Sequence, residues 1–506
     1  MAAELRGRAL VVLILLTCGV DFLLFGYDQG LFGGILGGSR FQAMLGNPSP
    51  TMSGLVTAIF DIGCALGATA SFFFGERLGR KNSIIYANVI VIIGAVIQTS
   101  SYSYAQMFVA RIIGGAGIGL STVAVPILQA ETLPARNRGA LLVVQSFLIP
   151  AGIAISCWLC LATLFAQSSL QWRFPVACQI LFSIIVLILC IWLPESPRWL
   201  AKAGRVNEAR HTIARILDKA DEDPEVEAEL GEILKFIGIE EKAGEASWTE
   251  VFRNDTKFRN LHRVLLGMGP FLINQWSGIN TLTYYLGYIL QTYLGYSPLV
   301  ATILAGVAFT QCALSAIPPY FFIDRLGRRV SIIISSAGCA VCLFIIGGGL
   351  QVQRSADAAA AVAFMFLYLD CYVLGFLPVS WSYSAEIQPL RVRNKATAVG
   401  VISHWISNFV VVLVTPIGFS NIGGNFFWIW AIVCSLFVPI AYLFGVETSG
   451  RTLEQVDQLF FDNPRILMGL NPESSLVYKP KPEDGETQVA AVIPGDGKVA
   501  AHDEKF

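Results

Sequence analysis

The sequence predicts an all-α integral membrane protein whose twelve transmembrane helices form two six-helix bundles. Three observations support this prediction: an apolar composition, a series of long apolar runs, and a repeat between the two halves of the chain. Of the 506 residues, 54% are hydrophobic and 14% are charged, against roughly 25% charged residues in soluble domains. The mean hydropathy is +0.61. This composition argues against a water-soluble globular protein.

Charge and cysteine content exclude several classes of protein. The formal net charge is -1, so there is no basic field to hold nucleic acid, and no nucleic-acid partner is expected. All 11 cysteines lie inside apolar runs, where they behave as small hydrophobic residues. No nucleophile–base set or metal-ligand cluster is evident. We therefore expect no enzyme activity, no metal site and no cofactor.

A helix needs about 20 mainly apolar residues to cross a bilayer. Twelve such runs follow one another along the chain, mostly separated by short charged loops. Their expected boundaries are 9–36, 52–74, 83–104, 109–130, 140–165, 174–193, 263–292, 298–322, 330–350, 361–385, 396–418 and 425–446. The lipid bilayer is therefore an expected partner.

One long polar segment divides the runs into six and six. It covers 195–262 and contains Val206, Ala209 and Ile213 at helical spacing, so short helices are expected there. The N-terminal bundle is then 1–194 and the C-terminal bundle 263–446. The tail, 447–506, is polar and rich in Pro, Gly, Glu and Lys, and we expect most of it to be disordered.

Positive charge in the short loops sets the orientation, because cytoplasmic loops carry an excess of Lys and Arg. The loops after the second, fourth, eighth and tenth runs carry Arg77, Arg80, Lys81, Arg136, Arg138, Arg325, Arg328, Arg329, Arg391, Arg393 and Lys395. The opposite side has few such residues. Both termini and the central segment are therefore expected to be cytoplasmic.

The two halves of the chain repeat each other. Residues 76–81 (ERLGRK) recur as 324–329 (DRLGRR), residues Glu131 and Arg138 recur as Glu386 and Arg393, and 195–196 recurs as 447–448. The repeats keep the same order at nearly the same offset. Such a parallel repeat predicts two bundles related by an axis along the membrane normal, with a cavity between them.

The repeated charged residues suggest a gate. Arg80 and Arg328 lie near helix ends, and we expect them to pair with Glu131 or Glu386 across bundle seams when the cytoplasmic side is shut. Such pairs favour an outward-facing state. The alternative is that they are solvated loop ends that only anchor the topology. The other residues assigned to this gate are Glu76, Arg77, Arg138, Glu195, Arg198, Asp324, Arg325, Arg393 and Glu447.

In combination, the motifs resemble those of the sugar porters of the major facilitator superfamily, over about residues 10 to 460. The matching segments are 26–28 (GYD), both Arg-x-Gly-Arg loops, 131–139, 194–198 (PESPR), 275–285, Trp381 and 447–451 (ETSGR). The resemblance implies import of a monosaccharide or polyol across the plasma membrane by alternating access. We expect a monomer. A non-transporting sugar sensor is a weaker alternative.

A buried acid suggests proton coupling. Asp28 lies within the first apolar run, where a charged side chain costs about 2.5 to 3.5 kcal/mol on insertion scales. Arg111 is its natural partner, and the resemblance implies that this pair couples the proton to the sugar. The alternatives are a static ion pair and an uncoupled facilitator. Asp21, Asp61 and Asp370 also lie in apolar runs, without an evident partner, and are expected to serve packing or hydration.

Sugar binding is expected on the seventh run. In a straight helix Gln275 and Asn280 would diverge by about 140°, but Gly278 permits local unwinding that turns both toward the cavity. The resemblance implies that these two residues bind hydroxyls and that Tyr284 and Tyr285 form an outer gate. Tyr284 is also expected to bind the substrate. Further expected binding residues are Asn274, Trp381, His404, Trp405, Asn408, Gln145, Ser146 and Cys312.

Four positions depart from the usual sugar-porter pattern. Asn274 stands where a second Gln is common, Ser146 follows Gln145 where a Gln is usual, and Cys312 and His404 stand where amides are common. Losing a buried hydroxyl partner typically costs about 1 to 3 kcal/mol. The departures therefore leave open whether the substrate is a hexose, a pentose or a polyol.

Overall fold

The structure is a computed structural model that describes residues 4–132, 138–243, 247–254, 259–351, 355–389, 391–451, 453–462 and 465–478. Across these ranges the regular structure is helical, without a β-strand. The predicted all-α class is therefore confirmed.

Six long helices make up the first bundle. They are α1 (Gly7–Ile35), α3 (Pro50–Leu78), α4 (Arg80–Thr99), α5 (Tyr104–Thr132), α6 (Arg138–Thr163) and α7 (Leu170–Cys190). A short helix, α2 (Ser39–Met44), which the apolar pattern did not predict, lies between α1 and α3. Ser49 caps α3 by accepting a hydrogen bond from the Met52 backbone, and Pro50 occupies the first helical position.

The second bundle contains two interrupted spans. The seventh span consists of α12 (Asn260–Trp276) and α13 (Ile279–Thr292). The eighth was expected as one helix over 298–322, and this is wrong: it consists of α14 (Pro298–Ser315) and α15 (Pro319–Leu326). The break falls at Pro318 and Pro319, because proline lacks the N–H needed to continue a helix. The remaining spans are α16 (Arg328–Gly349), α17 (Ser355–Glu386), α18 (Arg393–Ile422) and α19 (Phe426–Phe444).

By length and hydropathy, 10 helical segments of the described chain are long and apolar enough to cross a membrane. One of them, Lys395–Phe444, contains both α18 and α19, joined by the short 3₁₀ helix Gly423–Asn425. The halves α12 and α13 are each too short to be counted, at 17 and 14 residues, but together they cross the bundle. The described chain thus has the twelve spans that the apolar runs predicted.

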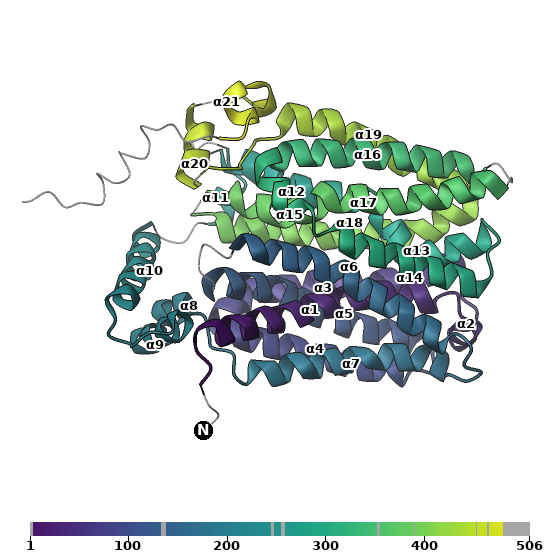
Figure 1. Cartoon of the computed structure of the whole chain (residues 1–506), viewed down its shortest axis with the longest axis horizontal. Coiled ribbons are helices and arrows are strands. Elements are labelled where there is room, and N and C mark those ends of the chain that lie inside the picture. The colour runs from purple at the N-terminus through teal and green to yellow at the C-terminus, as the bar shows by residue number, and fades with distance from the viewer. Residues whose placement is uncertain are drawn as a thin grey trace, which may run out of the picture.

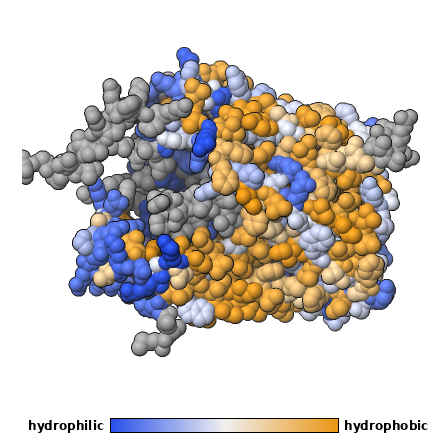
Figure 2. Space-filling view, in the orientation of Figure 1, coloured by the Kyte–Doolittle hydropathy of each residue, from blue (hydrophilic) through white to orange (hydrophobic). Residues whose placement is uncertain are grey.

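The spans run side by side along one common direction (Figure 1). The helices of the first bundle lie in the lower half of the view and most of the second bundle lies above them. The two bundles meet where α18 packs on α3 and α14 packs on α6. Exposed apolar side chains, such as Phe73, Ile93 and Leu436, cover the sides of the molecule. Figure 2 shows them as a broad apolar surface, as expected for a face in contact with lipid.

Polar helices gather at one end of the molecule, which we call the polar end (Figures 1 and 2). They are α8 (Pro197–Lys202), α9 (Val206–Leu217), α10 (Pro224–Ala243), α11 (Trp248–Val251), α20 (Leu453–Asp462) and α21 (Pro472–Ser475). The first four lie in the central polar segment, where short helices were predicted. Ala209 and Ile213 of α9 are buried against Leu200 and Val226. The described N-terminal residues lie at the same end, whereas α2 lies at the opposite end.

The tail was expected to be mostly disordered, and this is wrong for 453–462 and 465–478. Phe460 and Met468 are buried, and Asp457 forms an ion pair with Arg263 of α12 at 2.5 Å. Ser474 accepts a hydrogen bond from the backbone N–H of Glu447 at 2.7 Å. These contacts anchor the two segments to the second bundle, because they bury apolar surface and satisfy polar groups together. Residues 479–506 lie outside the described part.

Glycines bring the helices of the candidate site unusually close together. A Cβ added to Gly26 of α1 would lie 2.0 Å from the carbonyl oxygen of Ile149 on α6. Added at Gly119 of α5, it would lie 2.0 Å from the carbonyl oxygen of Cys64 on α3. Small residues permit such contacts between membrane helices. The close packing sets the positions of the acidic and basic side chains that α1, α3 and α5 carry.

Candidate functional site

Asp28 of α1 and Arg111 of α5 form an ion pair inside the first bundle. Arg111 Nη1 donates to both carboxylate oxygens of Asp28, at 3.0 and 3.2 Å. The side chains are 1% and 0% exposed. The partner that the sequence indicated for Asp28 is therefore the one in contact with it. A buried charge is tolerated when it is paired in this way.

The rest of the Arg111 side chain is enclosed by α1 and α3. Its guanidinium carbon lies 3.8 Å from the centre of the Phe32 ring and 4.2 Å from that of Phe60. Nη2 donates to the backbone carbonyl of Thr57 at 3.2 Å. Aromatic faces and a carbonyl thus hold the cation, and among the described residues Asp28 is the one carboxylate that forms an ion pair with it.

The seventh span breaks where the sequence placed the unwinding. Gly278 has a φ of +84°, a left-handed conformation that glycine adopts without steric cost. The break brings two side chains together that a straight helix would separate: Asn280 Nδ2 donates to Gln275 Oε1. Both belong to the predicted substrate-binding set.

Further amide contacts join this pair to α18 and then to the other bundle. Gln275 Nε2 lies 3.0 Å from His404 Nε2, and Asn280 Nδ2 donates to Asn408 Oδ1 at 2.7 Å. Asn408 Nδ2 in turn donates to Asp61 Oδ1 of α3 at 3.0 Å. All five residues are at most 4% exposed. A hydroxylated ligand can bind here only by replacing these mutual hydrogen bonds with its own.

Two tyrosines of α17 support the break, and sequence reasoning missed both. Tyr372 donates to Asn274 Oδ1 at 3.2 Å, while Asn274 Nδ2 donates to the carbonyl of Phe376 at 3.2 Å. Tyr368 donates to the carbonyl of Ser277 at 2.9 Å. The signal was available, because tyrosines four residues apart on an apolar helix share a face and need polar partners.

The predicted tryptophans take different places. Trp381 is partly buried and packs edge-on against Phe271, with 5.1 Å between ring centres, and against His404 at 5.4 Å. Trp405 is fully buried, and its ring lies 5.5 Å from that of Phe25 on α1. Trp381 therefore borders the amide network on one side, whereas Trp405 fills the contact between the two bundles.

Tyr284 and Tyr285 are each 1% exposed. Tyr285 donates to the carbonyl of Val412 on α18 at 3.2 Å, and the backbone of Tyr284 packs against Gly33 of α1. They lie between the two bundles, so the site is shut on their side. A cleft at the α2 end passes beside them, between α1, α6, α13 and α14, and its lining includes Thr283 and Gln291.

The remaining predicted binding residues are less closely placed. Ser146 of α6 and Cys312 of α14 are buried, at 7% and 3% exposed, without a side-chain bond to the amide network. Gln145 lies in α6, but its side chain is outside the described part of the structure.

The other intramembrane acids have amide partners that the sequence did not reveal. Asp21 accepts a hydrogen bond from Asn88 of α4 at 2.8 Å, and Asp370 accepts one from Gln311 of α14 at 2.6 Å. With Asp61 bound to Asn408, each acid that seemed to lack a partner has one. Within the described residues, no group of three or more His, Cys, Asp or Glu is placed to hold a metal ion.

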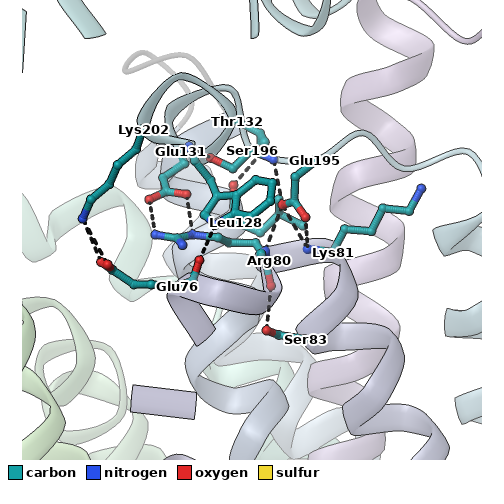
Figure 3. Close-up of polar contacts among 12 residues, drawn as sticks. Glu76, Arg80, Lys81, Ser83, Leu128, Glu131, Thr132, Glu195, Ser196 and Lys202 are labelled. Carbon is teal, nitrogen blue, oxygen red and sulfur yellow. Dashed lines mark hydrogen bonds and ion pairs between the residues drawn. The ribbon is translucent and has the colours of Figure 1, made fainter. Parts of the chain in front are cut away.

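At the polar end, the first copy of the repeated motif forms a closed cluster (Figure 3). Arg80 of α4 makes a two-pronged contact with Glu131 of α5, at 2.9 and 3.0 Å. Glu195 accepts hydrogen bonds from the backbone N–H groups of Arg80, at 2.9 Å, and Lys81, at 3.1 Å. Carboxylates are stabilised at such helix N-termini. Glu76 pairs with Lys202 at 3.1 Å in an exposed position.

The second copy repeats this geometry. Arg328 contacts Glu386 at 3.2 Å and Asp324 at 2.6 Å. Glu447 accepts from the backbone N–H groups of Arg328, at 2.9 Å, and Arg329, at 3.1 Å. The expectation that the arginines pair across bundle seams is wrong, because each pair lies within one six-helix bundle. The pairs join α4 to α5 and α16 to α17.

The other residues assigned to the gate are more peripheral. Arg77 and Arg325 are exposed, Arg198 is partly buried, and Arg393 donates to the carbonyl of Gln388 at 3.3 Å. The side chain of Arg138 and the whole of Arg136 lie outside the described part.

Twelve spans in two repeated bundles, with an ion pair buried inside the first bundle and a polar network that joins the two, define the class of membrane carriers. Comparison with known proteins agrees. The family described as "Sugar (and other) transporter" matches residues 12–460. The chain therefore belongs to this family, within the major facilitator superfamily, and is a multi-pass membrane protein.

Several curated relatives cover nearly the whole chain. The "MFS-type transporter oryC" of Aspergillus oryzae is 38% identical over 94% of this chain and 90% of its own. The "Sugar transporter STL1" of Saccharomyces cerevisiae is 32% identical over 90% of this chain and 82% of its own. These relatives are transporters, as predicted, and not enzymes.

Solved structures share the fold. The proton:xylose symporter XylE, bound to 6-bromo-6-deoxy-D-glucose, superimposes with a TM-score of 0.75 at 24% identity, over 90% of this chain and 100% of that one. The similarity in structure confirms the predicted major facilitator fold, and at 24% identity it shows the fold alone.

Proposed function

We propose that this transporter imports a monosaccharide or polyol together with a proton, across the plasma membrane and by alternating access. The observation that carries the proposal is the enclosed ion pair between Asp28 and Arg111. When an acid and a base are paired in a buried position, the stability of the pair depends on one proton, because protonation removes the charge of the acid.

Protonation is the step that links this pair to movement. When Asp28 binds a proton it loses its charge, and Arg111 no longer has its ionic partner. The contact between α1 and α5 weakens, and the sugar-binding state becomes more accessible. Coupling is then the difference in sugar affinity between the protonated and unprotonated carrier.

The available energy supports accumulation of substrate. A membrane potential of about 100 mV contributes about 2.3 kcal/mol per charge. One pH unit adds about 1.4 kcal/mol, so one proton sustains roughly a 500-fold sugar gradient. A facilitator without coupling sustains none.

The amide network supports a polyhydroxylated substrate. Gln275, Asn280 and Asn408 offer donors and acceptors within one small volume, and Trp381 lies beside them, in contact with His404, as a flat apolar surface. Sugar rings and polyols present hydroxyls together with C–H faces, and such a site matches both. Relatives named for sugar and for high-affinity hexose transport in Saccharomyces cerevisiae support this substrate class.

The polar end is proposed to be cytoplasmic, since it carries both described ends of the chain and the Arg-rich loops. The pairs Arg80–Glu131 and Arg328–Glu386 would then fix the helix ends of each bundle in the arrangement that closes the cytoplasmic side. Tyr284 and Tyr285 would form the gate on the outer side. The division into bundles 1–194 and 263–446, with 195–262 between them, and a monomeric carrier complete the proposal.

The test is sugar-induced alkalinisation of the medium around transport-deficient cells that express the chain. Hexoses, pentoses and polyols are screened with the wild type and with Asp28→Asn. We expect one substrate class to trigger proton entry in the wild type. In Asp28→Asn, proton entry is lost while exchange of labelled substrate persists. Equal uptake in both proteins without proton movement would establish a facilitator instead.

A further inference from the structure

If Asp28 takes up a proton during the transport cycle, Arg111 loses the only anion among its hydrogen-bond partners in the described structure. Its guanidinium donates to the two oxygens of Asp28 and to the carbonyl of Thr57. With Asp28 neutral, a fully buried cation would keep a carbonyl and two aromatic rings, but no anion. A buried charge left in this way is strongly destabilising. The cycle therefore needs a second anion within reach of Arg111.

Asp61 is placed to be that anion. It lies on α3 one helical turn after Thr57, whose carbonyl Arg111 already contacts, and it is 1% exposed. Its Oδ1 accepts from Asn408, while its Oδ2 is buried without a hydrogen-bond partner in the described structure. Asp61 lies close enough to both Arg111 and Asp28 to interact with them electrostatically. Its Oδ2 is thus a vacant acceptor within electrostatic reach of Arg111.

Among the described residues, Arg111 is the cation that acts on Asp61, and no second one lies around it. Around it, the described structure places Arg111 of α5, Asp28 of α1, Tyr284 and Tyr285 of α13, Cys64 of α3 and the neutral amide of Asn408 on α18. Two carboxylates therefore share one guanidinium. Without a proton the three groups carry a net charge of -1, and with one proton they are neutral. In a water-poor site, like charges that share one partner favour uptake of that proton.

We propose that Asp28, Asp61 and Arg111 act as a triad that binds a single proton, and that this proton is the one transported. The inference rests on the proposed proton coupling and extends it to Asp61. In the arrangement seen here, Arg111 pairs with Asp28 and the proton resides on Asp61. When the proton resides on Asp28, Arg111 pairs with Asp61. Release of the proton to the cytoplasm leaves the triad at -1, and uptake from outside restores neutrality.

This exchange also reaches the substrate site. Asp61 is held by Asn408, which accepts from Asn280, and Asn280 donates to Gln275. When Arg111 pairs with Asp61 Oδ2, it draws charge from the carboxylate whose Oδ1 accepts from Asn408, and the bond to Asn408 weakens. Asn408 and Asn280 are then free to bind ligand hydroxyls. The triad therefore connects the proton to the sugar through side chains in direct contact.

The experiment compares Asp61→Asn, Asp28→Asn and a matched control, Asp21→Asn. Asp21 is also a buried carboxylate bound by an amide, Asn88, but it does not contact Arg111. Each variant is measured for sugar-induced proton uptake and for exchange of labelled sugar in vesicles. We expect Asp61→Asn to lose proton uptake and keep exchange, because the remaining pair is neutral without a proton. Asp21→Asn keeps both activities.

The outcomes separate the two proposals. If Asp61→Asn retains proton uptake while Asp28→Asn loses it, the triad is wrong and coupling through Asp28 stands. If Asp28→Asn retains proton uptake, the proposed coupling itself fails. Loss of proton uptake in Asp21→Asn would overturn the triad by showing that any buried acid has this effect. Should Asp61→Asn not reach the membrane, Asp61→Ser replaces it, and proton uptake in that variant contradicts the triad equally.

Discussion

Gln275 of α12 and His404 of α18 lie 3.0 Å apart, Nε2 to Nε2, within the buried amide network. The amide N–H is the donor, so this imidazole nitrogen accepts. His404 is 4% exposed and packed between Trp381 and Trp405. It therefore orients the glutamine that is proposed to bind the ligand.

Replacing His404 by Ala should weaken substrate binding. Gln275 Nε2 would lose its acceptor on His404 and keep only a longer contact, 3.3 Å, with Asn274 Oδ1. Weakening the hydrogen bonding of a buried amide costs about 1 to 3 kcal/mol, or about ten- to hundredfold in affinity. The measurement is the KM for labelled substrate in vesicles. His211→Gln is the control, because His211 lies on α9 at the polar end, 37% exposed. An unchanged KM in His404→Ala would contradict the role of the pair.

The ion pair between Asp28 and Arg111 should contribute to the free energy of unfolding. Arg111→Gln leaves Asp28 without its counterion, and removing one partner of a buried pair typically costs about 3 to 5 kcal/mol. Asp28→Asn combined with Arg111→Gln removes both charges, so we expect it to be more stable than Arg111→Gln alone. Thermal unfolding in detergent measures the difference. Simple addition of the two single effects would show that the residues do not interact.

The clusters at the polar end should bias the carrier toward its closed cytoplasmic side. Arg80→Ala and Arg328→Ala each remove a pair that is largely buried, with Arg80 and Arg328 15% and 12% exposed. At about 1 to 2 kcal/mol for each pair, the open population should rise about five- to thirtyfold. Accessibility of an introduced cysteine at the polar end reports this population.

Glu76→Gln is the matched control for this gate. Its pair with Lys202 is about half exposed on both sides, and such surface pairs contribute little. The charge swap Arg80→Glu with Glu131→Arg should restore part of the closed population. A shift in Glu76→Gln as large as that in Arg80→Ala would mean that general surface charge, and not the pair, controls the gate.

Gly278 should not tolerate a side chain. Its φ of +84° is unfavourable for Ala by roughly 1 to 2 kcal/mol, and the added Cβ would lie 2.7 Å from the Trp430 ring. Gly278→Ala should therefore lower both the melting temperature and the uptake rate. Gly269→Ala, in α12, meets no atom within 4 Å and should be neutral or slightly stabilising. Equal behaviour of the two variants would contradict a fixed break at Gly278.

Much of the fold could be predicted because its determinants are local in the sequence. Length and hydropathy of each apolar run predict a membrane helix without reference to the rest of the chain. The Arg-x-Gly-Arg repeat predicted two matching halves, and Glu131 and Glu386 occupy equivalent positions in the structure. The break at Gly278 could also be predicted, since a glycine between two polar residues is a local signal.

Other features depend on which surfaces meet, and the sequence does not contain that information locally. The ordered segments 453–462 and 465–478 read as a polar tail, yet Asp457 finds a buried arginine on α12. The break at Pro318 was visible in the sequence but outweighed by the apolar run around it. The tyrosine pair on α17 needed the position of Ser277 before its role could be recognised.

The sequence by itself determined the helices, the repeat and the pairing of Asp28 with Arg111, because one acid and one base among apolar residues leave each other as the natural partner. Only the tertiary structure decided that Asp61 belongs to the same site. Its partner Asn408 lies 347 positions away, and an aspartate facing an amide looks no different in sequence from one facing lipid or water. Contact between the two bundles supplies the missing neighbour, and with it the chemistry of the acid.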